Sequence, residues 1–130
     1  MNLFLSFDGR IPRSKFWIGL LVLVVLNWVL MAIAGAVFGT SMMMSPDAAA
    51  NPEQAMQQMS AIFIPMMIVL LILLYPSLAV YTKRWHDRGK SGWWSLIMFI
   101  PIAGFIWMIV ELGILRGTDG DNKYGPDPLA

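Results

Sequence analysis

The stretch FWIGLLVLVVLNWVLMAIAGAVF, residues 16–38, contains no ionisable side chain, and Asn27 is its one amide. A helix rises about 1.5 Å per residue, so a stretch of this length extends over roughly 35 Å. The hydrocarbon core of a bilayer is about 30 Å thick, and lipid cannot satisfy the polar groups of an open backbone. The stretch therefore predicts a membrane-spanning helix and sets the class of the whole chain.

Two further segments are similarly apolar. Residues 61–81 carry no charge, and residues 93–115 carry only Glu111. Each would extend over roughly 31 to 35 Å as a helix, which is enough for one crossing. We therefore expect a single all-α membrane domain, a bundle of three transmembrane helices. The third helix should be kinked near Pro101 and Gly104, because these residue types are tolerated within membrane helices.

The composition of the chain agrees with this class. Of 130 residues, 58% are hydrophobic and 13% are charged, whereas about a quarter are charged in ordinary soluble domains. A small domain has too much surface for its volume to bury so much apolar material in water. The absence of cysteine excludes thiol catalysis, thiolate metal sites and disulfides. Because the net charge is only +1, nucleic acid is not expected as a partner. No cofactor is expected either.

Lysine and arginine predict the orientation. Seven of the nine basic residues fall before the first segment or between the second and the third. The positive-inside rule then places residues 1–15 and the basic loop 82–92 in the cytoplasm. The loop 39–60 and the tail 116–130 would lie on the external side of the membrane, the tail because the chain crosses three times.

A hairpin is the competing interpretation of the third segment. A re-entrant turn at Pro101 and Gly104 would return the tail to the cytoplasm and place all nine basic residues inside. The kinked single helix is favoured for two reasons. The two halves of the segment are too short to cross separately, and a turn exposed to lipid would leave backbone groups without hydrogen bonds.

The densest chemistry is KRWHDRGKSGWW, residues 83–94. Cations bind phosphate, and indole rings settle at membrane interfaces. With the N-terminal arginines, this stretch forms a candidate site for an anionic head group or a protein partner. A basic loop with its aromatic belt, which needs no ligand, is the competing interpretation. The candidate residues are Arg10, Arg13, Arg84, His86, Asp87, Arg88, Lys90, Trp93 and Trp94.

Other candidates lie within or beside the apolar segments. Glu111 is a candidate intramembrane ionisable group, although pairing with Arg116 would cover it at modest cost. Gly35 and Gly39 form a small-residue step that suits helix packing, either within the bundle or between copies. Their spacing is common in apolar helices, so it does not separate these two roles.

The outer loop is rich in methionine. Residues 42–44 are all methionine, and Met56 and Met59 would share one helical face of a helix that starts near Pro52. Thioethers are soft ligands for Cu(I). Methionine as an adaptable apolar filler is the favoured interpretation, and no metal site is expected.

Several motifs occur together in order along the chain. They resemble those of the YhaH-like bacterial inner-membrane proteins, a domain-of-unknown-function family (DUF805). The resemblance implies a small polytopic inner-membrane protein without an established reaction, and it supplies no catalytic residues. The motifs are Phe7-x-Gly9-Arg10-x-x-Arg13-x-x-Phe16-Trp17, Arg84-x-His86-Asp87-x-Gly89-Lys90-Ser91-Gly92-Trp93-Trp94, Ile100-Pro101 with Gly104, and Gly117-x-x-Gly120-x-Asn122-x-Tyr124-Gly125-Pro126-Asp127-Pro128.

The sequence carries no nucleophile and base pair and no metal set, so we expect a protein that is not an enzyme. The expected function is a lipid-interaction, protein-interaction or scaffold role in the membrane. The expected partners are membrane lipids, including anionic ones, and either further copies of the chain or another membrane protein. The alternative is an oligomeric transport or channel subunit, because three helices alone enclose little volume.

Overall fold

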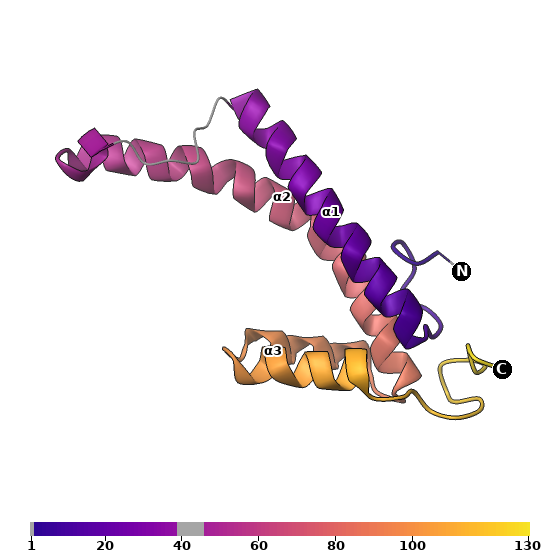
Figure 1. Ribbon diagram of the computed structural model, residues 1–130. Helices are drawn as coiled ribbons and strands as arrows, with labels where there is room; N and C mark the ends of the chain where they lie inside the picture. The colour runs from indigo at the N-terminus through magenta and orange to yellow at the C-terminus, as the bar shows by residue number, and fades with distance from the viewer. Residues whose placement is uncertain (1, 39–45) are drawn as a thin grey trace. The chain divides into compact units, whose positions relative to one another are not determined.

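The computed structural model describes residues 2–38 and 46–130, and these residues form helices and turns without a strand. The chain divides into two compact units. The terminal unit comprises Met1–Leu23 and Tyr75–Ala130, and the loop unit comprises Val24–Leu74. Figure 1 shows the helical elements, which in order are α1 (Arg13–Phe38), η1 (Pro46–Ala49), α2 (Pro52–Asp87), η2 (Gly92–Phe99), α3 (Ala103–Met108) and η3 (Ile109–Ile114).

The first two apolar segments are helical, as predicted. Helix α1 begins directly after Pro12, and α2 begins at Pro52, where the Asn51 side chain accepts a hydrogen bond from the Glu53 N–H (3.1 Å). Both helices are long and apolar enough to cross a membrane, and only 11% of the apolar window in each is buried within the protein. Such exposed apolar helices suit a lipid environment.

Helix α2 continues further than the sequence indicates. It ends at Asp87, and Gly89 has the positive φ of 72° that commonly follows a helix. The Gly89 N–H donates to the carbonyl of His86 (2.9 Å), and the Lys90 N–H donates to that of Trp85 (2.8 Å). Helix α2 therefore includes residues 82–87 of the predicted basic loop 82–92, and only residues 88–91 lie between helices.

The third apolar segment is a hairpin of two helical arms. The first arm is η2, and the second is α3 continued by the π-helical η3, and Figure 1 shows the arms side by side. Lys90 Nζ lies 2.8 Å from Glu111 Oε1. A single helix starting at Trp93 would carry Glu111 about 27 Å away. The prediction of one kinked helix over residues 93–115 is therefore wrong, and the predicted bundle of three transmembrane helices is confirmed only for its two long apolar helices.

The backbone groups at the turn of the hairpin are hydrogen-bonded within the hairpin, although the sequence analysis expects such a turn to leave them without partners. The carbonyls of Ile97, Ile100, Pro101 and Ile102 each accept a hydrogen bond from a backbone N–H of the hairpin, at 2.6 to 3.1 Å. Pro101 has no N–H to satisfy. The turn therefore leaves few polar groups for the surrounding lipid to satisfy.

Two residues set the geometry of the turn. Ile102 has φ 62° and ψ −62°, and the Ala103 N–H donates to the Pro101 carbonyl (2.6 Å), which together form a strained γ-turn. Gly104 lets the arms meet, since a Cβ at this position would lie 1.7 Å from the Ile97 carbonyl oxygen. The sequence signal of Pro101 and Gly104 thus marks a reversal of the chain.

Candidate functional site

A buried polar cluster, the arginine clamp, lies in the terminal unit. It comprises Arg10, Arg84 and Asp87, with exposed fractions of 4%, 0% and 3%. An arginine carries five N–H donors, and Arg10 uses them on Asp87 Oδ1 and on the backbone carbonyls of Thr118, Gly120 and Gly125. Arg10 therefore binds the tail to the end of α2.

Arg84 binds the other side of the clamp. Its Nε donates to the Leu112 carbonyl (2.6 Å), and its Nη2 donates to the Leu115 carbonyl (2.6 Å). Its Nη1 donates to Asp87, one turn further along α2. The last carbonyls of a helix lack partners within that helix and carry partial negative charge. Arg84 therefore caps the returning arm of the hairpin.

The tail follows the clamp closely. The Thr118 N–H donates to the Asp87 carbonyl (2.7 Å), and a Cβ at Gly117 would lie 1.9 Å from Asp87 Oδ2. Only glycine fits this approach without a shift of the carboxylate. In the tail itself, hydrogen bonds from the N–H groups of Leu129 and Gly120 lower the pKa of Asp127.

These contacts join the tail to the N-terminal segment. Arg10 follows residues 1–9 directly, and it binds three carbonyls between Thr118 and Gly125. Segments joined by direct hydrogen bonds cannot lie on opposite sides of a membrane. The structure therefore joins residues that the sequence analysis expects on opposite sides of the membrane, residues 1–15 and the tail 116–130, and the sidedness of the two stays a prediction.

Glu111 pairs with Arg88 and Lys90, whereas the sequence analysis considers Arg116 as its partner. Arg88 Nε lies 2.9 Å from Glu111 Oε2, and Lys90 Nζ lies 2.8 Å from Oε1. Arg116 instead pairs with Asp119 at 3.4 Å, with both side chains exposed. Glu111 is therefore part of a bridge between the returning arm and residues 88–91.

His86 packs against the tail. Its ring stacks on Tyr124 with centroids 3.9 Å apart, its Nδ1 donates to the Gly9 carbonyl (3.1 Å), and its own carbonyl accepts from Asn122 Nδ2 (2.9 Å). Burial lowers the pKa of His86, against the raising effect of the Gly9 carbonyl. The ring is therefore neutral at pH 7, and it holds the tail by stacking.

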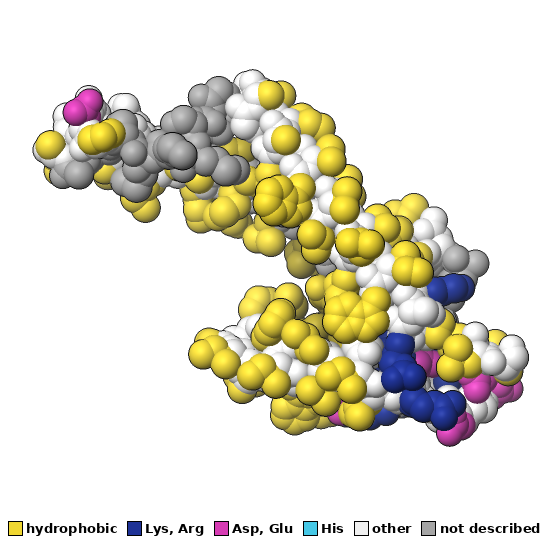
Figure 2. Space-filling view, in the orientation of Figure 1, with side chains coloured by type: hydrophobic (Ala, Val, Ile, Leu, Met, Phe, Trp, Pro, Cys, Tyr) yellow, Lys and Arg dark blue, Asp and Glu magenta, His cyan; other side chains and the backbone are white. Residues whose placement is uncertain are grey.

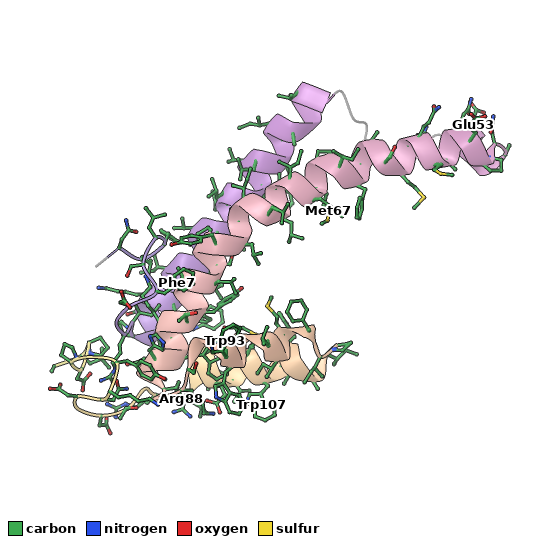
Figure 3. All side chains as sticks on the ribbon, turned by 180° about the vertical axis from the view of Figure 1, so that it is seen from behind. Phe7, Glu53, Met67, Arg88, Trp93 and Trp107 are labelled. Carbon is green, nitrogen blue, oxygen red and sulfur yellow. The ribbon has the colours of Figure 1, made fainter. Side chains whose placement is uncertain are left out.

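The remaining candidate residues lie nearer the surface. Arg13 is exposed and donates to the Ile114 carbonyl (2.7 Å), while Trp93 and Trp94 are 79% and 41% exposed. Lys90 Nζ lies 5.0 Å from the centre of the Trp94 ring. Figure 3 shows Trp93 on the hairpin with Arg88 at its base, and Figure 2 shows lysine and arginine side chains gathered beside the hydrophobic surface of the hairpin.

Sequence reasoning missed Lys83 as a structural residue. Its side chain is fully buried, and its Nζ donates to the carbonyls of Asn2 (2.5 Å) and Leu3 (2.6 Å). Lys83 therefore fastens the N-terminal segment to α2. The available signal was its position one residue before Arg84. Both residues lie in α2, beyond the predicted segment 61–81.

The other candidates stay predictions. Gly35 is half-buried in α1, and Gly39 lies outside the described residues, as do the methionines at 42–44. Met56 and Met59 are exposed on α2, in the loop unit. Their packing and ligand roles are therefore untested.

The family model described as "Protein of unknown function (DUF805)" matches residues 4–126. The Escherichia coli K12 proteins named "Inner membrane protein YhaH" and "Inner membrane protein YhaI" are 29% and 30% identical to the chain. Each alignment covers 96% of the chain, and 88% and 87% of the respective relative. "Uncharacterized protein YiiR" of the same strain is 30% identical, over 94% of the chain and 85% of its own length.

No solved structure matches the chain. The named inner-membrane relatives and the two long apolar helices support an inner-membrane location. The family model covers nearly the whole length of the sequence, including the clamp, the hairpin and most of the tail. The chain therefore belongs to the DUF805 family of proteins of unknown function.

Proposed function

We propose that the chain is a non-enzymatic inner-membrane protein whose terminal unit contacts anionic lipid on the cytoplasmic side. The observation that carries this proposal is the union, in one unit, of an exposed apolar hairpin and a band of exposed cations. Phe99, Ile102 and Phe105 of the hairpin are 75%, 78% and 65% exposed. Side chains of this kind belong in lipid, while neighbouring cations meet phosphate groups.

The dimensions of the hairpin support insertion into one leaflet. Arms of eight and twelve residues rise about 16 to 18 Å. This is roughly half of a hydrocarbon core of about 30 Å. Only α1 and α2 would then span the bilayer, and the hairpin would enter and leave on the same side.

The charges of the chain favour the cytoplasm for that side. With two spanning helices, all nine lysine and arginine residues fall on one face of the membrane. The positive-inside rule assigns such a face to the cytoplasm. The anionic lipids of that leaflet attract basic groups by about 1 kcal/mol each.

The cations that remain available are few. Arg10 and Arg84 are buried in the arginine clamp, whereas Arg13, Lys15 and Arg116 are exposed. We expect the triple variant Arg13→Gln, Lys15→Gln and Arg116→Gln to lose about tenfold or more of its preference for phosphatidylglycerol over phosphatidylcholine. Native mass spectrometry of the protein released from mixed-lipid nanodiscs would measure this preference.

A single-charge variant provides the control. Lys123 is an exposed cation of the tail that lies over the Tyr124 ring at 5.0 Å, and Lys123→Gln should change the preference little. An unchanged preference in the triple variant would contradict the proposal. The alternative of an oligomeric transport or channel subunit stays a prediction, and its first requirement is assembly of several copies in the same nanodiscs.

A further inference from the structure

A second site in the terminal unit differs in charge from the surface that carries the exposed cations Arg13, Lys15 and Arg116. A pocket of about 440 Å³ lies between the N-terminal segment, the end of α2 and the start of η2. No lysine or arginine lines it, and its one carboxylate belongs to Asp8. The lining residues are Phe7, Asp8, Leu78, Thr82, His86, Ser91, Gly92, Trp93, Ser95 and Leu96.

The pocket has a polar end and an apolar end. Leu78, Thr82 and His86 follow one another at intervals of four along α2, so they form one stripe on a single face. The stripe runs from an apolar residue to polar ones over about 12 Å. Such a gradient suits a molecule that crosses from acyl chains to a polar head group.

The pocket lining contains unused hydrogen-bonding capacity. Ser95 is 3% exposed, and its Oγ has no hydrogen-bond partner within the described part of the chain. A buried hydroxyl without a partner is unfavourable and is usually satisfied by a ligand or by water. Asp8 also makes no ion pair with any described residue. A ligand with several N–H donors would satisfy both groups.

We propose that this pocket binds the head group of a phosphatidylethanolamine-type lipid, with its primary ammonium between Asp8 and Ser95 and its acyl chains along Leu78, Leu96 and Trp93. A primary ammonium has three N–H donors and a positive charge. The carboxylate supplies the counter-charge, and the hydroxyl supplies a neutral acceptor. A quaternary ammonium has no N–H, so phosphatidylcholine would leave Ser95 unsatisfied. This site is independent of the contact with anionic lipid, because it contains no cation.

The test uses the full chain in nanodiscs with a fixed fraction of phosphatidylglycerol. The remaining lipid is either phosphatidylethanolamine or phosphatidylcholine, and native mass spectrometry counts the molecules retained. We expect phosphatidylethanolamine to be retained about tenfold more strongly. Asp8→Asn and Ser95→Ala should each remove most of this difference while leaving the retention of phosphatidylglycerol unchanged.

Asp119→Asn is the matched control, because Asp119 is an exposed carboxylate outside the pocket and should not matter. Asp8 is exposed, so its substitution should not disturb folding, and hydrogen exchange of α2 would check this. Equal retention of the two lipids, or an unchanged difference in Asp8→Asn, would overturn the proposal.

Discussion

At the scale of single residues, the clamp is organised around one carboxylate. Asp87 accepts from Arg10 and Arg84, and its own carbonyl accepts from the Thr118 N–H. The two guanidinium groups also bind six backbone carbonyls from Ile11, the hairpin and the tail. Both arginines are buried, so their charges depend on these partners for the solvation that water would otherwise give. Removing the carboxylate should therefore affect the whole tail.

We expect Asp87→Asn to destabilise the attachment of the tail by about 3 kcal/mol or more, because it leaves two buried guanidinium charges without their counter-charge. Hydrogen exchange of the backbone amides in residues 117–125 measures this opening. The control is Asp119→Asn, which breaks an exposed pair at 3.4 Å and should cost less than about 1 kcal/mol. Equal protection of the tail in the two variants would argue against the clamp.

The attachment of the tail should depend on pH through His86. Burial lowers its pKa from an ordinary value of 6.5, so the detached state binds more protons than the packed state between the two pKa values. Attachment of the tail therefore weakens as pH falls through 6.5, and it changes little above that pH. Protection of residues 118–125 should be lower at pH 5.5 than at pH 7.5. His86→Phe keeps an aromatic ring beside Tyr124 without a titrating group, and it should show a smaller difference between these pH values.

At the scale of the elements, the hairpin depends on one strained turn. Ile102 is β-branched and has a φ of 62°, a conformation that glycine adopts without penalty. Its side chain is 78% exposed, so the substitution Ile102→Gly removes little packing. The strained backbone conformation lies at the residue where the chain reverses. Glycine at this position should therefore remove the strain and keep the hairpin.

We expect Ile102→Gly to stabilise the hairpin by about 1 kcal/mol. Gly104→Ala should disrupt it, because the added Cβ would lie 1.7 Å from the Ile97 carbonyl oxygen. Ala103→Ser, at an exposed neighbouring position, is the control for Gly104→Ala. Hydrogen exchange of residues 97–106 in nanodiscs would compare the three variants. Faster exchange in Ile102→Gly than in the parent chain would show that the turn is not strained.

At the scale of the whole molecule, hydropathy and capping residues were enough to predict two helices. Hydropathy marks residues 16–38, which lie within α1, and Pro52 marks the first residue of α2. These signals are local, because a helix start depends on the few residues around it. The family was also recognisable, because its motifs stand in order along most of the chain.

The hairpin and the clamp could not be predicted in this way. Hydropathy counts apolar residues, so it gives the same result for one helix of 23 residues and for two short arms joined by a turn. The choice depends on contacts distant in sequence, such as Lys90 with Glu111 and Arg10 with Gly120. The apolar segment does contain one clue, since Glu111 needs a cation nearby, and two cations precede the segment at Arg88 and Lys90.

The proposed topology predicts that the third apolar segment turns back, so that the tail lies on the same side of the membrane as the N-terminal segment. The chain has no cysteine, so Asp8→Cys, Asp47→Cys and Asp119→Cys introduce single thiols before α1, before α2 and in the tail. A membrane-impermeant maleimide applied to intact cells, and then to permeabilised cells, reports the side of each thiol. We predict that the thiol at position 47 reacts in intact cells, whereas those at positions 8 and 119 react only after permeabilisation. Reaction of the thiol at position 119 together with that at position 47 in intact cells would contradict the proposed topology.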